Sequence, residues 1–467
     1  MNSSGNTRAY RSIKDTDMLP LLFLGLAFSL AAMPNPLVQM PFAIFFGFVP
    51  LFFFNQQLFG LKRALINLIY MELLVMGLLT PLDAQNLFYI FPASLYLISM
   101  FLVAGSICSL SFTIASFLSD KYGWNMSPLF YGTSWVLIQY LLTNVTIAFP
   151  FPIETSLSAF PIMIQSARYF GSYFLAFLII FTNAILANAF INKKRAIWGI
   201  TILTLLLVHT LNIGYGFWLL NSTSQLGEPV RIAIIQTNLT MRDFVLKEKC
   251  RMFKNIFKNN MINFSADSLN EKPGLIIWPE SSSEYALQDD NCLKVLHENI
   301  TSKGSELLIG TEFIDYCRDR KKYNIAFILK TNGDMTEPYK KNIIFPIFET
   351  RWASRGNDFM ALPSSTPIKN VGCMICLESI FPQVARGLTR SGAKALVCIS
   401  VDTTFGNSMI PYIHSASMIL RAVENNRYGI HVGNSGPSII CDNKGRVITQ
   451  IPYGKTAYAN AIVYPEN

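Results

Sequence analysis

The sequence predicts a multi-span α-helical membrane domain followed by a water-soluble α/β domain. Of the 467 residues, 51% are hydrophobic and 14% are charged, whereas about 25% are charged in an ordinary soluble domain. The charges are unevenly distributed: residues 1–222 contain ten Lys or Arg and six Asp or Glu, and residues 223–467 contain 28 and 23. We therefore expect a transmembrane domain of about seven helices over 1–222 and a soluble domain over 223–467.

Apolar segments in the first half are each roughly long enough to cross about 30 Å of hydrocarbon. They cover residues 18–34, 36–54, 64–81, 88–118, 128–145, 169–191 and 196–220. Basic residues follow the second, fourth and sixth segments, at Lys62–Arg63, Lys121 and 193–195, and the loops after the first and third contain none. This alternation predicts a cytoplasmic N-terminus and places the chain after residue 222 outside the cytoplasm.

Two flanking segments complete this topology. Residues 1–17 are polar and basic, which is typical of a cytoplasmic tail. The loop at about 146–168 is apolar and rich in proline, and the topology places it outside the cytoplasm. This loop is either a packed or re-entrant loop or one wall of a lipid-facing site.

From Arg231 onward, short runs rich in β-branched residues alternate with helical patterns. The runs are RIAIIQ, LIIWPE, ELLIG, NIAFIL, VGCMIC and ALVCIS, and the helical patterns cover about 242–262, 289–303 and 411–427. Strands that alternate with helices indicate an α/β domain with largely buried strands. The final stretch, 446–467, is expected to form hairpin strands.

Composition makes several classes of partner improbable. The net charge of +9 is shared between the two halves, so it does not indicate nucleic acid. The four histidines show no metal-ligand spacing, and the Cys373–Cys376 pair lies within an apparent strand instead of at the helix start of a redox motif. We therefore expect no metal and no cofactor. Nothing in the sequence marks an oligomer interface, so we expect a monomer.

Three motifs of the soluble domain carry residues that can work together. LIIWPES ends near Glu280, PYKKNIIFPIFE carries Lys341 and Glu349, and VGCMICLES carries Cys376. A thiolate is a nucleophile, an ammonium lowers its pKa and stabilises an oxyanion, and a carboxylate accepts the thiol proton. Taken singly, each residue has an ordinary structural explanation: a core cysteine, a turn and a solvated lysine.

Cys376 and Glu378 raise a separate question. If the strand continues through ICLES, alternation places both side chains on the same face. A buried carboxylate without a partner costs several kcal/mol. Glu378 is then either part of the chemistry or merely exposed.

The three motifs, in this order, resemble the Glu–Lys–Cys triad of the nitrilase superfamily, and the whole chain is similar to the apolipoprotein N-acyltransferases of Gram-negative bacteria. LIIWPES resembles the family's WPE stretch, YKKNIIFPIFE its Tyr-x-Lys-x-x-Leu-Val-Pro-Phe-Gly-Glu, and ICLESIFP its Ile-Cys-Tyr-Glu. The stretches DTTFGNS, LRAVENNR and GNSGPS resemble its closing motifs. The resemblance implies an α-β-β-α sandwich for the soluble domain.

By resemblance, the catalytic residues are Glu280, Lys341 and Cys376. Supporting roles fall to Glu378, Glu349 and Asn324, the last matched through KYNIAFIL. The sequence departs from the family pattern at Leu377, Phe348 and Thr404, and the family's usual last membrane helix has no counterpart here. We therefore expect an altered substrate pocket around an intact triad.

The resemblance implies transfer of an acyl chain from a membrane phospholipid to the N-terminal cysteine amine of a diacylglyceryl-lipoprotein, through a thioester on the cysteine. It places the protein in the cell inner membrane with the catalytic domain in the periplasm. Trp352, Phe359 and Met360 either line the lipid entrance or pack as ordinary loop residues. Two alternatives remain: a membrane-anchored amidase that hydrolyses a small amide, and an inactive paralogue that binds lipoproteins or lipid.

Overall fold

The computed structural model describes residues 15–80, 93–145, 150–192, 195–222, 227–239, 261–282, 288–316, 319–345 and 349–465. Almost all of the expected N-terminal tail and of the expected helix over 242–262 lies outside these residues. So does Phe348, one of the departures from the family pattern.

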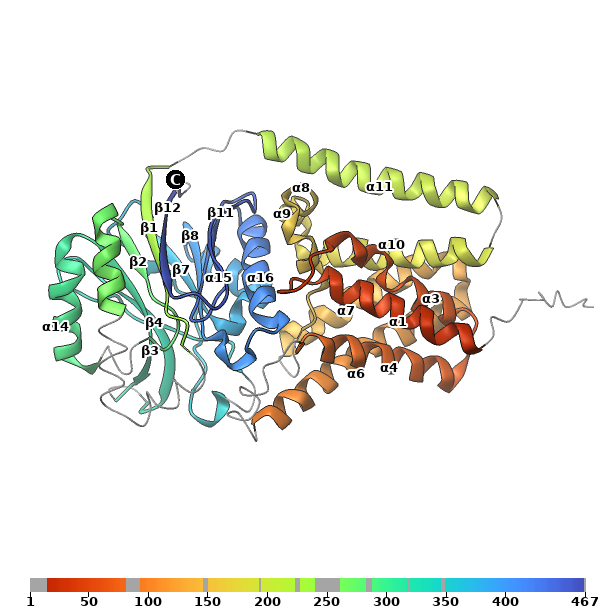
Figure 1. Ribbon diagram of the computed structural model, residues 1–467, viewed down its shortest axis with the longest axis horizontal. Helices are drawn as coiled ribbons and strands as arrows, with labels where there is room; N and C mark the ends of the chain where they lie inside the picture. The colour runs from red at the N-terminus through yellow and green to blue at the C-terminus, as the bar shows by residue number, and fades with distance from the viewer. Residues whose placement is uncertain are drawn as a thin grey trace, which may run out of the picture.

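The first half of the chain is a bundle of helices (Figure 1). The longer helices are α1 (Asp15–Ala32), α4 (Gly60–Gly77), α6 (Ala93–Tyr122), α7 (Ser127–Val145), α10 (Ser172–Asn192) and α11 (Arg195–Asn221). Within the described residues, three helices are long and apolar enough to cross a membrane, namely 98–122 of α6, α10 and α11. Shorter apolar helices cover 18–32 and 41–55. The number of spans and their orientation stay predictions.

The second expected span is divided into short helices. These are η1 (Pro41–Ala43), α2 (Ile44–Gly47) and α3 (Val49–Asn55). Pro41 and Pro50 lie in the first turns of η1 and α3. Proline is tolerated there because the first N–H groups of a helix have no intrahelical acceptor. The prolines thus explain why one apolar stretch forms several helices.

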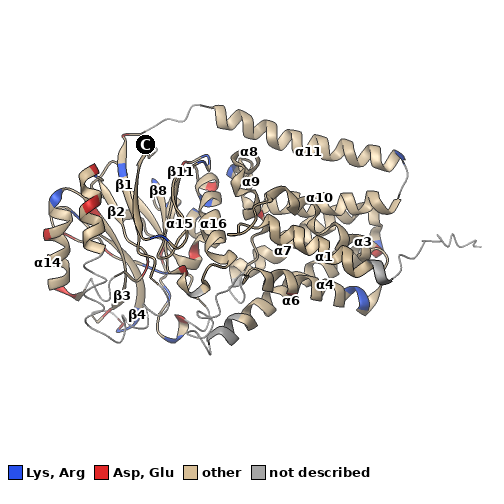
Figure 2. Cartoon of the chain, viewed as in Figure 1, with Lys and Arg blue, Asp and Glu red and all other residues tan. Residues whose placement is uncertain are grey.

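Charged residues are sparse in the helical part and common in the α/β part (Figure 2). In the helical part, Lys and Arg gather where α4 and α11 begin, at the end farthest from the sheets. Arg63 in α4 pairs with Asp120 in α6, with 2.5 Å between Nη1 and Oδ2. The basic helix ends therefore lie on the side opposite the α/β part.

The α/β part contains two six-stranded sheets packed face to face. The first has the order β12-β1-β2-β3-β4-β5: β12 (Ala457–Val463), β1 (Val230–Gln236), β2 (Leu275–Ile277), β3 (Glu306–Ile314), β4 (Lys322–Leu329) and β5 (Tyr339–Lys340). The second has the order β11-β10-β9-β8-β7-β6: β11 (Val447–Ile451), β10 (Ser438–Cys441), β9 (Tyr428–Gly433), β8 (Ala395–Ser400), β7 (Asn370–Ile375) and β6 (Leu362–Pro363).

Helices cover the outer faces of the two sheets (Figure 1). Helix α14 (Asp290–Asn299) lies on the first sheet, and α15 (Pro382–Arg390) and α16 (Met409–Asn425) lie between the second sheet and the helical part. The expected α-β-β-α sandwich is therefore confirmed. All six predicted runs form strands, and β1, β2, β7 and β8 are almost wholly buried, as their uninterrupted apolar sequences indicate.

The expected C-terminal hairpin is wrong. Strand β11 pairs with β10 in the second sheet, and β12 pairs antiparallel with β1 in the first sheet. The intervening residues 452–456 cross from one sheet to the other. Alternating apolar residues identify two strands but do not determine which neighbour completes each backbone ladder.

The expected loop between α7 and α10 is a packed connection between the two parts. It contains η3 (Ile153–Ala159), α8 (Pro161–Ile164) and α9 (Ala167–Phe170), and α16 packs against both η3 and α9. Arg421 of α16 donates from Nη2 to the Ser172 hydroxyl at 2.9 Å, and Gln165 donates to the carbonyl of Lys444 at 2.8 Å. These contacts fix the α/β part against the helical part.

Candidate active site

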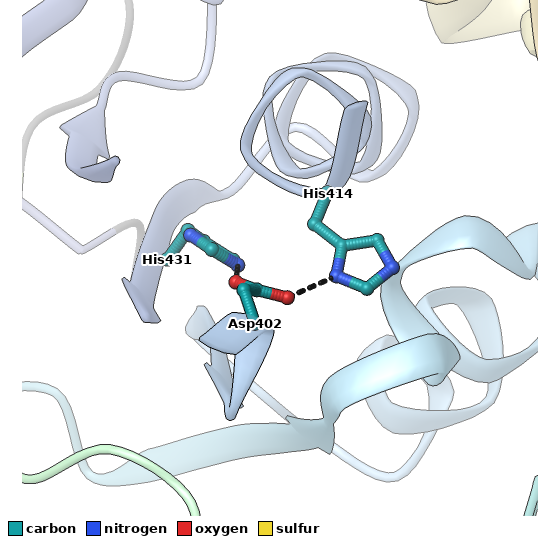
Figure 3. A group of neighbouring side chains, drawn as sticks. All are labelled: Asp402, His414 and His431. Atoms are coloured by element: carbon teal, nitrogen blue, oxygen red, sulfur yellow. Dashed lines mark hydrogen bonds and ion pairs between the residues drawn. The ribbon is translucent and has the colours of Figure 1, made fainter. Parts of the chain in front are cut away.

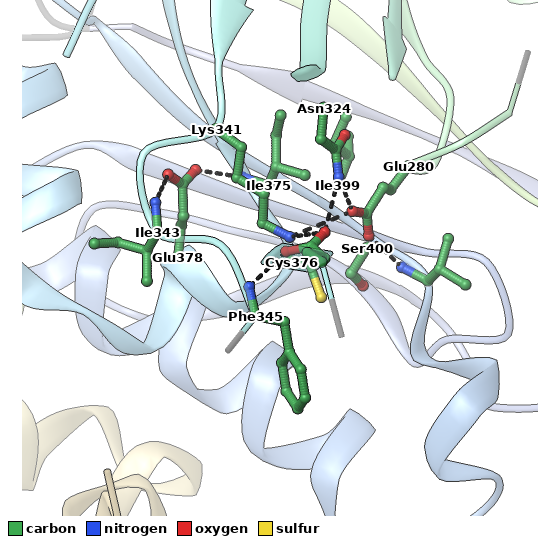
Figure 4. Close-up of polar contacts among 12 residues, drawn as sticks. Glu280, Asn324, Lys341, Ile343, Phe345, Ile375, Cys376, Glu378, Ile399 and Ser400 are labelled. Atoms are coloured by element: carbon green, nitrogen blue, oxygen red, sulfur yellow. Dashed lines mark hydrogen bonds and ion pairs between the residues drawn. The ribbon is translucent and has the colours of Figure 1, made fainter. Parts of the chain in front are cut away.

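Three predicted residues meet where strands of both sheets end (Figure 4). Glu280 follows β2, Lys341 follows β5 and Cys376 follows β7. The Lys341 ammonium lies 3.5 Å from Oε1 of Glu280 and 2.8 Å from Oε1 of Glu349. Figure 4 shows the Cys376 side chain beside the Glu280 and Lys341 side chains. The fold thus brings together residues that lie 96 positions apart in the chain.

The two carboxylates beside Lys341 are held by additional donors. Asn324 in β4 donates from Nδ2 to Oε1 of Glu280 at 2.7 Å and to Oε1 of Glu349 at 3.1 Å. The backbone N–H of Val401 donates to Oε2 of Glu280 at 2.9 Å, and that of Phe345 to Oε2 of Glu349 at 2.6 Å. The predicted supporting residues Asn324 and Glu349 therefore both contact the cluster and orient its charged groups.

Burial and charge shift the proton affinities of this cluster. Burial raises the pKa of Glu280, and the nearby ammonium of Lys341 only partly opposes this. Burial lowers the pKa of Lys341, but Glu349 and Glu280 together raise it above its ordinary value. Burial and then Glu280 raise the pKa of the Cys376 thiol. The resting cluster is therefore a neutral thiol beside a permanent ammonium and a carboxylate of increased basicity.

The backbone bends sharply at Cys376. The strand β7 ends at Ile375 and the 3₁₀-helix η8 (Cys376–Ile380) begins at the next residue. Cys376 has φ of +54°, a left-handed conformation that costs a non-glycine residue roughly 1–3 kcal/mol. Such strain is retained where surrounding contacts impose it, and here it places Cys376, a partly buried residue, at the end of the strand.

Glu378 does not share the environment of Cys376, so the expectation based on strand alternation is wrong. The strand has already ended, and the fully buried Glu378 side chain accepts hydrogen bonds from the N–H groups of Ile375, Asn342 and Ile343 and from the Tyr339 hydroxyl. These four donors lie 2.6–3.0 Å from its oxygens. We call this group the Glu378 clamp, because it ties the loop after Lys341 to the strand before Cys376.

The residues expected at the lipid entrance are partly buried. Phe359 and Met360 pack against the main hydrophobic cluster, and the Phe359 ring lies against Gly387 of α15. The Trp352 ring lies 4.8 Å from Nζ of Lys322. A role in lipid entry stays a prediction for all three.

One polar group was missed by the sequence analysis. Within the part of the chain that the structure describes, Asp402, His414 and His431 form the group of side chains able to hold a metal ion (Figure 3). They come from η9 (Asp402–Phe405), from α16 and from β9, so their spacing resembles no local metal motif. The sequence did contain one indication of this group. Each of the three polar residues lies within or directly after an apolar stretch in the region of the closing family motifs.

The departure at Leu377 has a structural explanation. Its side chain is 3% exposed and belongs to the main hydrophobic cluster. It thus occupies the core next to the nucleophile, where a polar hydroxyl would need a partner. The side chain of Thr404 lies outside the described part of the chain.

Comparison with known proteins agrees with this geometry. The carbon-nitrogen hydrolase family model matches residues 263–462, which include all three predicted catalytic residues. An apolipoprotein N-acyltransferase from Geobacter metallireducens is 27% identical over 359 residues, covering 70% of this chain and 67% of that protein. Residues 263–462 thus form a carbon-nitrogen hydrolase domain. Over most of its length, the chain is similar to the apolipoprotein N-acyltransferases.

Two further comparisons, with a relative and with a solved structure, show how far the similarity extends. Apolipoprotein N-acyltransferase 2 from Treponema denticola is 24% identical to this chain over 390 residues, covering 73% of this chain and 72% of that protein. Among solved structures, Saccharomyces cerevisiae Nit3, a member of branch 10 of the nitrilase superfamily, aligns with a TM-score of 0.43 and 19% identity. That alignment covers 52% of this chain and 93% of the yeast protein.

Proposed function

We propose that this protein transfers an acyl chain from a membrane phospholipid to the α-amine of the N-terminal cysteine of a diacylglyceryl-lipoprotein. Relatives named apolipoprotein N-acyltransferase align with most of the chain, including part of the helical half. The catalytic residues in this proposal are Glu280, Lys341 and Cys376. Glu349, Asn324 and Glu378 position them.

The observation that carries this proposal is that one buried hydrophobic cluster extends from the helical part to the nucleophile. Leu78 and Leu79 after α4, Phe405 in η9 and Met409 in α16 belong to one buried hydrophobic cluster, and Cys376 packs against it. The backbone N–H of Met409 donates to the carbonyl of Leu78 at 3.1 Å, which joins the two parts at this point. In this proposal an acyl chain from the membrane reaches the thiol from this apolar side, whereas a small polar amide would need no apolar surroundings.

In the first step, Glu280 accepts the Cys376 proton as Sγ forms a bond to the ester carbonyl carbon. The ester oxygen becomes an oxyanion, and the Lys341 ammonium stabilises it. Collapse of this intermediate breaks the carbon–oxygen bond to the glycerol. The departing oxygen takes the proton from Glu280, which leaves a lysophospholipid and a thioester on Cys376. The raised pKa of Glu280 makes this carboxylate a stronger base than an ordinary glutamate.

In the second step, the lipoprotein amine attacks the thioester carbonyl. Glu280 accepts the amine proton, Lys341 again stabilises the oxyanion, and the carbon–sulfur bond breaks. The thiolate recovers the proton, so the products are an N-acyl amide and the free thiol. A thioester retains much of the reactivity of the original ester toward an amine, so no nucleotide is needed.

The proposal also includes the location of the protein and its partners. Residues 1–222 would span the cell inner membrane several times with a cytoplasmic N-terminus, and residues 223–467 would lie in the periplasm. The basic starts of α4 and α11 are opposite the α/β part, which is the arrangement expected if the catalytic domain is periplasmic. Phospholipid is the acyl donor, the lipoprotein is the acceptor, and the protein works as a monomer without nucleic acid.

The test is transfer of a labelled acyl chain. The detergent-purified protein is incubated with a phospholipid carrying an isotopically labelled acyl chain and with a diacylated lipopeptide that has a free cysteine amine. We expect the label on that amine, by fragment-ion mass spectrometry, with wild type and none with Cys376→Ser. An N-acetylated lipopeptide is the control acceptor. Absence of transfer from every common phospholipid, together with hydrolysis of small amides, would favour the amidase alternative.

A further inference from the structure

The Asp402, His414 and His431 cluster lies behind the active site and is fully buried. Asp402 and His431 are 0% exposed and His414 is 1% exposed. Nδ1 of His414 lies 2.7 Å from Oδ1 of Asp402, and Nε2 of His431 lies 3.8 Å from Oδ2 (Figure 3). Within the described residues, Asp402 forms ion pairs with these two histidines, and neither partner carries a permanent charge.

The hydrogen atoms in this cluster do not satisfy its acceptors. Nδ1 of His431 lies 3.1 Å from the carbonyl of Pro437, which can only accept, so the ring proton is on Nδ1 and the lone pair of Nε2 faces Asp402. The Ser400 hydroxyl lies 2.6 Å from Oδ2 of Asp402 and 3.2 Å from Nε2 of His431. Its single hydrogen can serve only one of them. One buried acceptor is thus left without a hydrogen, and among the described residues the carboxylate has no partner with a permanent positive charge.

We propose that Asp402, His414 and His431 bind one divalent transition-metal ion of the zinc type. Two imidazole nitrogens and one carboxylate oxygen are a frequent ligand set for such an ion. The bond from His431 to the Pro437 carbonyl is the outer contact that metal-binding histidines usually make, since it fixes the ligand nitrogen toward the ion. The ion supplies the positive charge that the buried carboxylate lacks.

The spacing of the ligand atoms suits this ion after small adjustments. The three atoms all lie within 4.8 Å of one another. A tetrahedral ion with bonds of about 2.0–2.1 Å needs its ligands roughly 3.4 Å apart. The contact between His414 and Asp402 must lengthen as the ion replaces the Nδ1 proton. Among the described residues, Nε2 of His414 has no hydrogen-bond partner, so it is free to take the proton that leaves Nδ1. The Ser400 hydroxyl, which lies beside both Asp402 and His431, is placed to be the fourth ligand.

The ion would have a positioning role. Asp402 directly follows Val401, whose N–H donates to the catalytic carboxylate of Glu280. Fixing Asp402 between β9 and α16 therefore fixes the end of β8 behind the general base. Metal binding itself does not depend on the acyl-transfer proposal, so the two can fail separately.

The experiment measures metal in the full-length, detergent-purified protein by elemental mass spectrometry, and then its affinity for added Zn²⁺ against a coloured chelator. Two variants are designed to keep the fold while removing a ligand. In His431→Gln an amide N–H replaces the ring lone pair, and in His414→Asn the amide keeps a donor toward Asp402. His297→Gln is the matched control, because His297 lies outside the cluster in α14. Co²⁺ absorption then distinguishes nitrogen and oxygen ligands from cysteine thiolates.

We expect one Zn²⁺ per chain in wild type and in His297→Gln, and at least about 100-fold weaker binding in both cluster variants, in the range of effects for lost metal-site groups. The Co²⁺ spectrum should lack the thiolate charge-transfer band. Equal binding by all four proteins, a thiolate band, or no stoichiometric binding by wild type would each overturn the proposal. In the last case, a proton on His431 would be the missing charge.

Discussion

The two sides of Cys376 each contain a buried glutamate, and the difference between them lies in their partners. On one side, Glu280 contacts Lys341, Asn324 and the N–H of Val401. On the other side, Glu378 accepts only from N–H groups and a tyrosine hydroxyl that hold the backbone together. Burial raises the pKa of both carboxyls, to about 7 for Glu378.

The comparison teaches that a raised pKa does not by itself identify a general base. Glu280 shares its site with a thiol whose pKa its own charge raises, so a proton can pass between them. Glu378 is surrounded by donors, so its oxygens are committed to the clamp. This difference supports the proposal that Glu280 transfers the proton and that Glu378 has a positioning role.

The largest expected effect is that of Glu280→Gln. Loss of a general base lowers a rate by about 10²–10⁴-fold. We expect Cys376 acylation, followed by mass spectrometry in single-turnover experiments, to slow by this amount. The fold should persist, because Lys341 keeps Glu349 at 2.8 Å as its partner. A thermal unfolding midpoint that falls sharply in this variant would show a structural role instead.

Lys341→Met should affect both stability and activity. It leaves Glu280 and Glu349 buried without their cation, and breaking a buried pair in this way costs about 3–5 kcal/mol. Denaturant unfolding in detergent measures this cost. The double variant Lys341→Met with Glu349→Gln should recover much of the stability and none of the acylation. Recovery of acylation would contradict the proposed oxyanion role.

Glu378→Gln should have a moderate effect that is mainly structural. The amide nitrogen would face an N–H donor, and an unsatisfied buried group costs about 1–3 kcal/mol. We expect a lower unfolding midpoint, a smaller loss of acylation than in Glu280→Gln, and an unchanged pH profile. A shifted profile would place Glu378 in the proton transfer and remove the distinction between the two sides.

The smallest effect is a shift of the pH dependence. Below its pKa Glu280 is protonated and cannot accept the thiol proton, so acylation should fall as pH decreases through a value above that of an ordinary glutamate. Asn324→Ala removes a hydrogen-bond donor to the Glu280 carboxylate, and this raises the pKa of Glu280. The fall in the acylation rate should therefore occur at higher pH. The shift is about one unit, since such a bond contributes about 1.5 kcal/mol and one unit is about 1.4 kcal/mol. Asn332→Ala, which changes an exposed asparagine, is the control, and its acylation rate should fall at the same pH as that of wild type.

Much of this arrangement could be predicted from the sequence, for identifiable reasons. Uninterrupted apolar runs such as ALVCIS indicate buried strands, because each residue of β8 is buried. The order of the three motifs predicted which residues meet at the strand ends. The very short strands β5 and β6 were not predictable, because two residues carry no periodic pattern.

What escaped prediction depends on backbone geometry or on distant contacts. The strand containing Cys376 ends at the residue before it, and only the positive φ of Cys376 shows why Glu378 turns toward the loop after Lys341. Asp402 and His431 come from different elements and meet because β8 and β9 are neighbours. Neither feature can be predicted from the spacing of residues along the chain.

The most direct measurement is the intact mass of the detergent-purified protein after incubation with phospholipid alone. We expect wild type to gain the mass of one fatty-acyl group, and neutral hydroxylamine or a diacylated lipopeptide to remove it. Cys376→Ser should show no adduct that hydroxylamine removes. No adduct on wild type with any common phospholipid, or an adduct that persists in Cys376→Ser, would contradict acyl transfer through a thioester on Cys376.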